Sequence, residues 1–202
     1  MTPRSGCLLR RSRLTSGKDK RLKEYHYAPE QLVRIRREPD SSRDLPPAQW
    51  PVSSRRDISY PALEEGAVLT SMPALLLVAG SVVEAPGQAA TVYVHGDFNF
   101  YRVRLRVVGE EQVEVDYSLV GGTQQMKGDR SAIVVGLQVD PVGTSRGDPE
   151  FSLLGLGGRV SILLDRQSRL PLQVRGRAPR IGETEINLVA ADIGPPPREQ
   201  LP

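Results

Sequence analysis

With 202 residues and a net charge of +3, the chain has the length of one ordinary domain. An aromatic share of 5%, with 19 glycines and 17 prolines, favours a loop-rich β protein over a helical bundle. The lone Cys7 excludes an intramolecular disulfide, and the longest apolar stretch, residues 72–83, is too short to form a membrane span.

The positive charge is concentrated near the amino terminus. Residues 1–56 contain 14 Lys or Arg against 6 Asp or Glu, a net charge of +8, whereas the remainder contains 13 against 18, a net charge of −5. Residues 1–20 are predicted to be a basic, irregular segment. They contain no apolar run of the kind that a secretory signal requires, so the protein is cytoplasmic if this start is genuine.

The next elements are two short strands and one helix. Residues 21–27 and 31–37 are rich in β-forming side chains and predict a hairpin with a turn at residues 28–30. Residues 39–61 form a Pro-rich connection, which cannot join a central sheet. Thr70 or Ser71 is positioned to cap a short helix over residues 70–83, with Pro73 in its first turn.

A second hairpin is predicted between residues 101–107 and 113–119. Apolar residues occupy the odd positions of both segments, while arginines occupy the even positions of the first and Gln, Glu and Asp those of the second. Opposed residues must share a face, so the loop has an odd length, such as residues 109–111. The arginines then face the acidic row, which indicates a solvated sheet face and not a phosphate-binding stripe.

The last third of the chain predicts a three-stranded meander. Val160, Ile162 and Leu164 are expected to pair with Val174, Leu172 and Leu170, across a polar loop at residues 165–169. Leu163 is the one apolar residue on the wrong face. Val174 is expected opposite Ile186, with arginine and glutamate pairs on the solvent face and a turn at residues 178–182.

The sequence contains few residues that predict catalysis or metal binding. His26 and His95 are the only histidines, so a histidine-rich metal site is impossible, and the glycines of residues 155–158 precede a strand and not a helix. No catalytic, cofactor-binding or metal-ligating residue is predicted, and the protein is expected not to be an enzyme. That expectation changes if a cleft brings His95 and Asp97 beside a serine.

Three segments carry a resemblance to a known family: residues 96–103, residues 113–119, and above all residues 160–177 with Leu170, Pro171 and Leu172 after a polar turn. Over residues 21–192 the chain resembles the bacterial exported family catalogued as domain of unknown function 3108. The resemblance implies a periplasmic, β-rich protein without enzymatic activity. Members of that family begin with a signal peptide and further strands, so the chain is expected to be truncated at its amino terminus.

The predicted fold is therefore mainly β: a curved antiparallel sheet or open half-barrel of meander hairpins, with one short helix packed on it. Residues 21–193 are expected to form a single domain, followed by a disordered tail at residues 194–202.

The first functional hypothesis is a non-catalytic bacterial envelope protein that binds an apolar small molecule or a protein partner in this curved sheet. The alternative is a cytoplasmic binder of nucleic acid or an anionic surface through the basic residues 10–37, although no recognition motif accompanies the charge and nucleic acid is disfavoured as a partner. For the first hypothesis the expected ligand-lining residues are Tyr101, Val103, Leu105, Val115, Tyr117, Ile162, Leu164, Leu172 and Val174.

Overall fold

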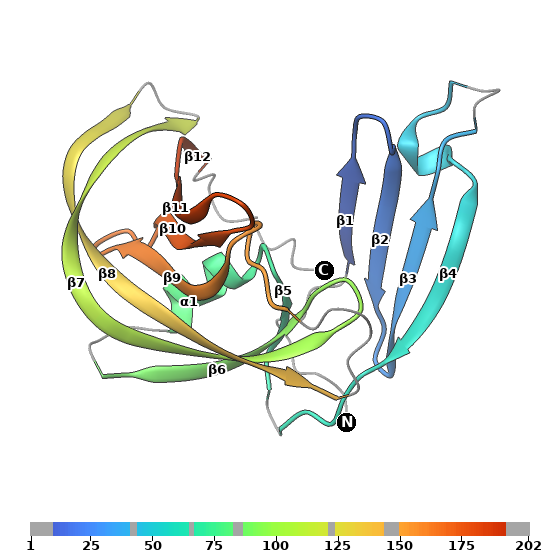
Figure 1. Cartoon of the computed structure of the whole chain (residues 1–202), viewed down its shortest axis with the longest axis horizontal. Coiled ribbons are helices and arrows are strands. Elements are labelled where there is room, and N and C mark those ends of the chain that lie inside the picture. The colour runs from blue at the N-terminus through green and yellow to red at the C-terminus, as the bar shows by residue number, and fades with distance from the viewer. Residues whose placement is uncertain are drawn as a thin grey trace, which may run out of the picture. The chain divides into compact units, whose positions relative to one another are not determined.

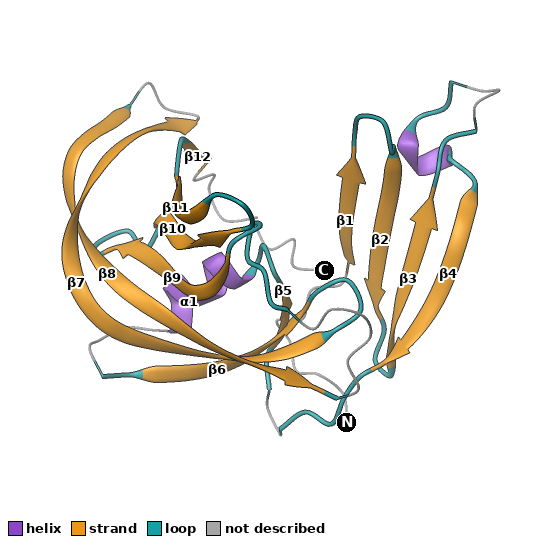
Figure 2. Ribbon diagram, in the orientation of Figure 1, coloured by secondary structure: helices purple, strands orange, loops and turns teal. Residues whose placement is uncertain are grey.

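The computed structural model describes residues 10–40, 44–64, 67–82, 87–120, 124–143 and 150–192. In this part of the chain the protein is mainly β with a single α-helix, which confirms the predicted fold class (Figures 1 and 2). The strands form two sheets, and the strand order of neither closes into a barrel. The predicted tail at residues 194–202 lies outside the described residues.

One sheet has four antiparallel strands in the order β1-β2-β3-β4. Its members are β1 (Arg10–Thr15), β2 (Arg21–Tyr27), β3 (Gln31–Arg37) and β4 (Val52–Ser59). The other sheet has the order β11-β10-β9-β8-β7-β6-β5, and β12 pairs with β7 outside this path. Its members are β5 (Leu69–Ser71), β6 (Ala89–His95), β7 (Phe100–Val120), β8 (Gln125–Val142), β9 (Gly157–Asp165), β10 (Pro171–Ala178), β11 (Gly182–Asn187) and β12 (Ala190–Asp192).

The chain divides into two compact units. The first comprises Met1–Leu75, Thr91–Val103 and Val139–Pro149, and the second comprises Leu76–Ala90, Arg104–Gln138 and Glu150–Pro202. Strands β6, β7 and β8 contribute residues to both units. The expectation of a single domain over residues 21–193 therefore stays a prediction.

The four-stranded sheet contains both predicted strands and two that were not predicted. Strands β2 and β3 have the expected bounds, and the amide of Ala28 donates to the carbonyl of Gln31 at 3.0 Å across their turn. The expectation of an irregular segment at residues 1–20 is wrong where β1 pairs with β2. The Pro-rich connection at residues 39–61 contains the short 3-10 helix η1 (Pro47–Gln49) and β4. Strand β4 lies at the sheet edge, where flanking prolines are tolerated.

The predicted helix is shorter than expected. Helix α1 (Leu75–Val82) follows β5, in which Thr70 pairs with Val94 of the parallel neighbour β6. Thr70 is therefore a strand residue and not a cap, whereas the hydroxyl of Ser71 accepts a hydrogen bond from the amide of Ala74 at 3.4 Å. A Cβ added at Gly80 would lie 2.7 Å from the carbonyl oxygen of Arg169, so only glycine lets the helix backbone approach this turn so closely.

The second predicted hairpin is wrong. Residues 100–120 form one continuous strand, β7, which curves strongly together with β8 and has no turn at residues 109–111 (Figure 1). The apolar residues of both predicted arms occupy odd positions, so an uninterrupted strand keeps all of them on one face without any shift of register. The arginine row consequently faces β8: Arg102 contacts Asp140 at 3.3 Å and Arg104 contacts Gln138 at 3.1 Å.

The terminal meander is present, with one change of register. Strands β10 and β11 pair as predicted, with Val174 opposite Ile186 and a turn between Ala178 and Gly182. Between β9 and β10, however, Ile162 lies opposite Val174 and not Leu172, because the register shifts between Pro171 and Gln173.

This irregularity places Leu172 in a cluster with Leu163. Leu163, predicted to lie on the wrong face, is completely buried there with Val113, Val115, Tyr117 and Ala132. We call this set the second-unit core. The first unit has a separate cluster of Tyr25, Leu32, Leu69, Tyr93 and Phe100, which we call the first-unit core.

Candidate functional site

All nine residues expected to line a ligand site are buried, with exposed fractions between 0% and 7%. Val115, Tyr117 and Leu172 belong to the second-unit core, where they pack against other side chains. Tyr101 and Val103 lie in the first unit and the other seven in the second. Their shared property is therefore burial within a protein core, and of the nine, Val115 and Leu172 also line a groove in the second unit.

The groove has a volume of about 570 Å³ and lies between β7 on one side and the β10–β11 hairpin on the other. From β7 it is lined by Gln112, Val113, Glu114, Val115 and Asp116, and from β8 by Lys127. The other wall consists of Leu172, Gln173, Arg175, Glu185, Asn187, Leu188 and Val189.

The lining shows that the groove faces the edge of β7. Val113 and Val115 point into the second-unit core, whereas Gln112, Glu114 and Asp116 occupy the alternate, more exposed face of the strand. Side chains from the two faces of a strand line one groove when the groove runs along the backbone edge between them.

The strand neighbours of β7 locate this edge. On the side away from β8, the pairing with the β6 segment reaches Val107, whose amide donates to the carbonyl of Gln88 at 3.4 Å. Strand β12 begins its parallel pairing at Ser118. Among the described residues, no strand pairs with the intervening part of β7 on this side. We call this gap between β7 and the β10–β11 hairpin the seam.

One side-chain ion pair spans the seam, and a backbone hydrogen bond joins its walls just beyond it. Arg175 donates to Glu111 at 2.7 Å across it, and beyond the seam the amide of Ser118 donates to the carbonyl of Val189 at 3.1 Å. Asp116 interacts with Gln125 and, at 3.3 Å, with Lys127. These hydrogen bonds hold the pKa of Asp116 below its usual range, so it remains an anion on the rim.

The histidine considered for catalysis lies in the first unit. His95 is fully buried, its Nδ1 lies 3.3 Å from the hydroxyl of Tyr27, and its Nε2 is buried without a partner in the described part of the chain. Burial lowers the pKa of His95 to about 3, with a further contribution from Arg11, so the ring is neutral at physiological pH. A group with so low a pKa is a weak general base.

A serine does lie beside His95, because Ser71 of β5 is its partner across the parallel strand pair. The hydroxyl of Ser71 nevertheless accepts the hydrogen bond from Ala74, and Asp97 accepts hydrogen bonds from Lys23, Tyr25 and Arg34. Burial raises the pKa of Asp97, but these hydrogen bonds lower it more, and the net pKa lies far below the usual range. This arrangement neutralises charge and does not activate a nucleophile.

Sequence reasoning missed the groove residues Leu188 and Val189, and it missed that part of β7 has no strand partner on one side among the described residues. Alternation identifies the two faces of a strand, but it does not reveal which edge of the strand lacks a neighbour.

No group of three or more metal-binding side chains occurs among the described residues, and no helix there is long and apolar enough to cross a membrane. Comparison of the chain with protein-family models, with curated proteins and with solved structures gave no match.

Proposed function

We propose that the protein is a non-catalytic binding protein that takes up an extended peptide segment of a protein partner in the seam of its second unit. The observation that carries this proposal is the stretch of β7 between Val107 and Ser118, with which no strand pairs on this side among the described residues. A peptide strand added to such an edge gains main-chain hydrogen bonds, while alternate side chains enter the flanking pockets.

The lining favours a peptide over an apolar small molecule. Apolar ligand pockets are lined mostly by hydrophobic side chains, whereas this groove alternates apolar residues with Gln112, Glu114, Asp116 and Gln173. A strand with alternating side chains matches this pattern: apolar residues face Val113, Val115 and Leu172, and polar residues face the charged rim. A segment of typical strand length, about five or six residues, is expected.

The resemblance to the domain of unknown function 3108 family supplies the rest of the proposal. It supports, as part of this proposal, a location in the periplasm of the bacterial envelope, where the partner would be another envelope protein. This location rests on the resemblance alone, whereas the binding mode rests on the seam.

The test uses a display library of heptapeptides that alternate apolar and polar residues, selected against the full chain. We expect selected peptides to protect backbone amides of residues 109–117 from hydrogen exchange, and to lose binding when alternate peptide nitrogens are methylated. Glu114→Lys, on the rim, is expected to change which peptides are selected. Glu183→Lys, on β11 at a position that does not line the groove, is the matched control.

Two results contradict the proposal. One is a library that yields no peptide protecting residues 109–117. The other is a fluorescent fatty acid that displaces selected peptides and binds more tightly than they do, because it identifies the groove as a site for apolar small molecules.

A further inference from the structure

The Lys and Arg side chains of β1, β2 and β3 form two groups: those whose charge is compensated by a carboxylate and those whose charge is not. Two carboxylates, Glu24 and Asp97, accept most of these contacts, and Arg11 donates to the carbonyls of His95 and Gly96 at 3.3 and 2.8 Å. The compensated cations are Arg10 and Arg37 on Glu24, Lys23 and Arg34 on Asp97, and Arg36 on Glu38.

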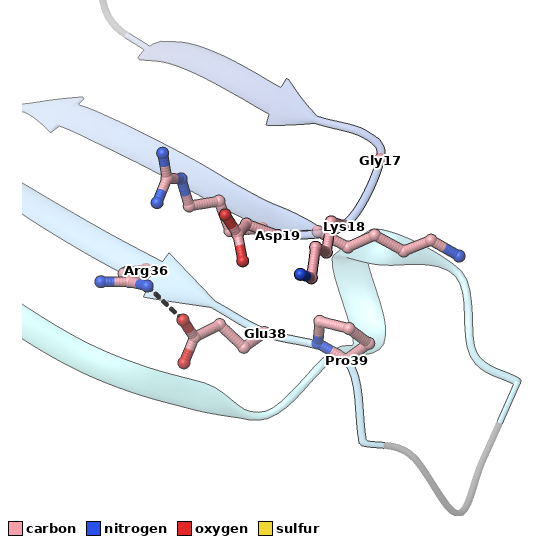
Figure 3. A pocket seen from close by; sticks show the side chains of 8 residues that line it. Gly17, Lys18, Asp19, Arg36, Glu38 and Pro39 are labelled. Carbon is pink, nitrogen blue, oxygen red and sulfur yellow. Dashed lines mark hydrogen bonds and ion pairs between the residues drawn. The ribbon is translucent and has the colours of Figure 1, made fainter.

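Arg13 of β1 has no ion-pair partner among the described residues and does not line the pocket described here, whereas three other uncompensated cations gather at one end of the sheet. Lys18 and Lys20 lie in the β1–β2 turn and Arg21 begins β2, and none of the three has an ion-pair partner among the described residues. They line a pocket of about 540 Å³, which we call the basic pocket (Figure 3). Its other lining residues are Gly17, Asp19, Arg36, Glu38 and Pro39.

The register explains how two arginines enter this pocket from different strands. Lys23 lies opposite Arg36, and Arg21 precedes Lys23 by two residues, so Arg21 and Arg36 share one face of the sheet. The Nε–H groups of both arginines are buried without an acceptor in the described part of the chain. An anion that brings acceptors to these guanidinium groups satisfies donors that the protein leaves unpaired.

The net charge of the basic pocket indicates how much negative charge a bound anion carries. Four cations line it against two carboxylates, and Glu38 already binds Arg36, as the dashed line in Figure 3 shows. The net charge of +2 matches one phosphate group. Away from the pocket, Glu24 and Asp97 compensate four cations of the same sheet, Arg10, Arg37, Lys23 and Arg34, which reduces the basic charge available to a long polyanion.

We propose that the basic pocket binds a small molecule carrying a phosphate group. The guanidinium fork of an arginine donates to two phosphate oxygens at once, and lysines add mobile positive charge. The site is independent of the seam, because it is built from residues of the first unit and the seam from residues of the second.

The experiment titrates the full chain with inorganic phosphate, with adenosine monophosphate and with a deoxythymidine oligomer, while amide chemical shifts are recorded. We expect saturable shifts at residues 17–21 and 36–38 with adenosine monophosphate. Arg21→Gln is expected to weaken this binding about tenfold or more. Lys20→Gln, at an exposed position, is expected to weaken it as well and guards against a folding defect in the first variant.

Arg55→Gln is the matched control. Arg55 lies opposite Ile35, on the other face of the same sheet from Arg36, and its replacement is expected to leave binding unchanged. Saturation by inorganic phosphate alone supports the site and shows that the phosphate group is the recognised part.

Three outcomes overturn the proposal. The first is an absence of saturable shifts at these residues with either phosphate or the nucleotide. The second is unchanged binding in both Lys20→Gln and Arg21→Gln. The third is tighter, steeply salt-dependent binding of the oligomer that Arg55→Gln weakens equally, which indicates an extended polyanion surface.

Discussion

Glu24 and Asp97 are the residues on which the charge balance of the first unit depends. The side chain of Glu24 is 5% exposed and accepts hydrogen bonds from Arg10 and from Arg37, the latter at 2.8 Å. Asp97 accepts hydrogen bonds from Lys23, Tyr25 and Arg34. Because Arg34 is only 5% exposed, its charge has little access to water and depends on Asp97.

Replacing Asp97 by asparagine is expected to lower the free energy of unfolding by about 2 kcal/mol, because the buried Arg34 loses its counter-charge. The effect is smaller than for a fully buried pair, since the carboxylate is 38% exposed and partly screened by water. Chemical denaturation of the two proteins measures the difference. Asp57→Asn, at an exposed pair with Arg55 at 3.7 Å, is the control and is expected to cost less than about 0.5 kcal/mol. Equal losses in the two variants would contradict this assignment.

Because of His95, the free energy of unfolding of the first unit is expected to depend on pH. Its pKa of about 3 in the folded state lies below the value of about 6.5 expected in the unfolded chain. Below about pH 6.5 the His95 ring therefore binds a proton in the unfolded state but stays neutral in the folded state. The contribution of the neutral ring to the free energy of unfolding is fully present above about pH 6.5 and falls as the pH decreases toward about 3.

By about pH 5 this loss is expected to reach about 2 kcal/mol. The measurement is the free energy of unfolding of the parent and of His95→Gln between about pH 7 and about pH 5, where Asp97 and Glu24, whose pKa values are lowered, remain charged. The glutamine variant is expected to have a flatter profile, whatever its absolute stability. A His95 ring resonance that titrates near its ordinary pKa of about 6.5 in the folded protein would refute the argument.

At the scale of elements, local pattern predicted strands well and strand neighbours poorly. The bounds of β2 and β3 follow from β-forming residues and a tight turn, and the β10–β11 register follows from Arg175 facing Glu185. The β9–β10 register was wrong because an irregularity near Pro171 leaves no trace in the alternation. The seam could not be predicted, since it depends on where β6 and β12 end and not on the residues of β7 themselves.

A substitution at Gly109 distinguishes a hairpin turn at residues 109–111 from a continuous strand β7. Its φ is not positive, and a Cβ built on it meets nothing within 4 Å. Gly109→Val is therefore expected to leave stability unchanged or to raise it by up to about 1 kcal/mol, because valine favours a strand. Thermal denaturation provides the measurement.

Gly182→Val is the matched control for Gly109→Val. Gly182 has a φ of 94° at the β10–β11 turn, where a valine is strained, and a loss of about 1–2 kcal/mol is expected. A similar loss at Gly109 would indicate a turn at residues 109–111.

At the scale of the whole molecule, the first-unit core and the second-unit core, two clusters of the described residues, share no residue. The first-unit core lies close to ionised side chains, because Tyr25 donates a hydrogen bond to Asp97. The second-unit core consists of aliphatic residues and a single phenol, that of Tyr117. Strands β6, β7 and β8 and helix α1 contribute residues to both units, so a disturbance in one unit has covalent routes to the other.

Leu172→Asp tests whether the two units unfold separately. Leu172 is 2% exposed in the second-unit core, so aspartate there buries an unpaired carboxylate or forces its protonation, at a cost of about 3 kcal/mol or more. Hydrogen exchange is expected to show lost protection at Ala132 and Leu163, while Leu32 in the first-unit core retains its protection.

Arg175→Ala is the control for Leu172→Asp. The side chain of Arg175 is 39% exposed and forms ion pairs at 2.7 and 3.8 Å, so its removal is expected to cost about 1 kcal/mol or less and to leave exchange in both cores unchanged. An equal and simultaneous loss of protection at Leu32 and Leu163 in Leu172→Asp would contradict separate unfolding. The chain would then behave as the one cooperative domain that the sequence predicts for residues 21–193, with β6, β7 and β8 transmitting the disturbance between the two cores.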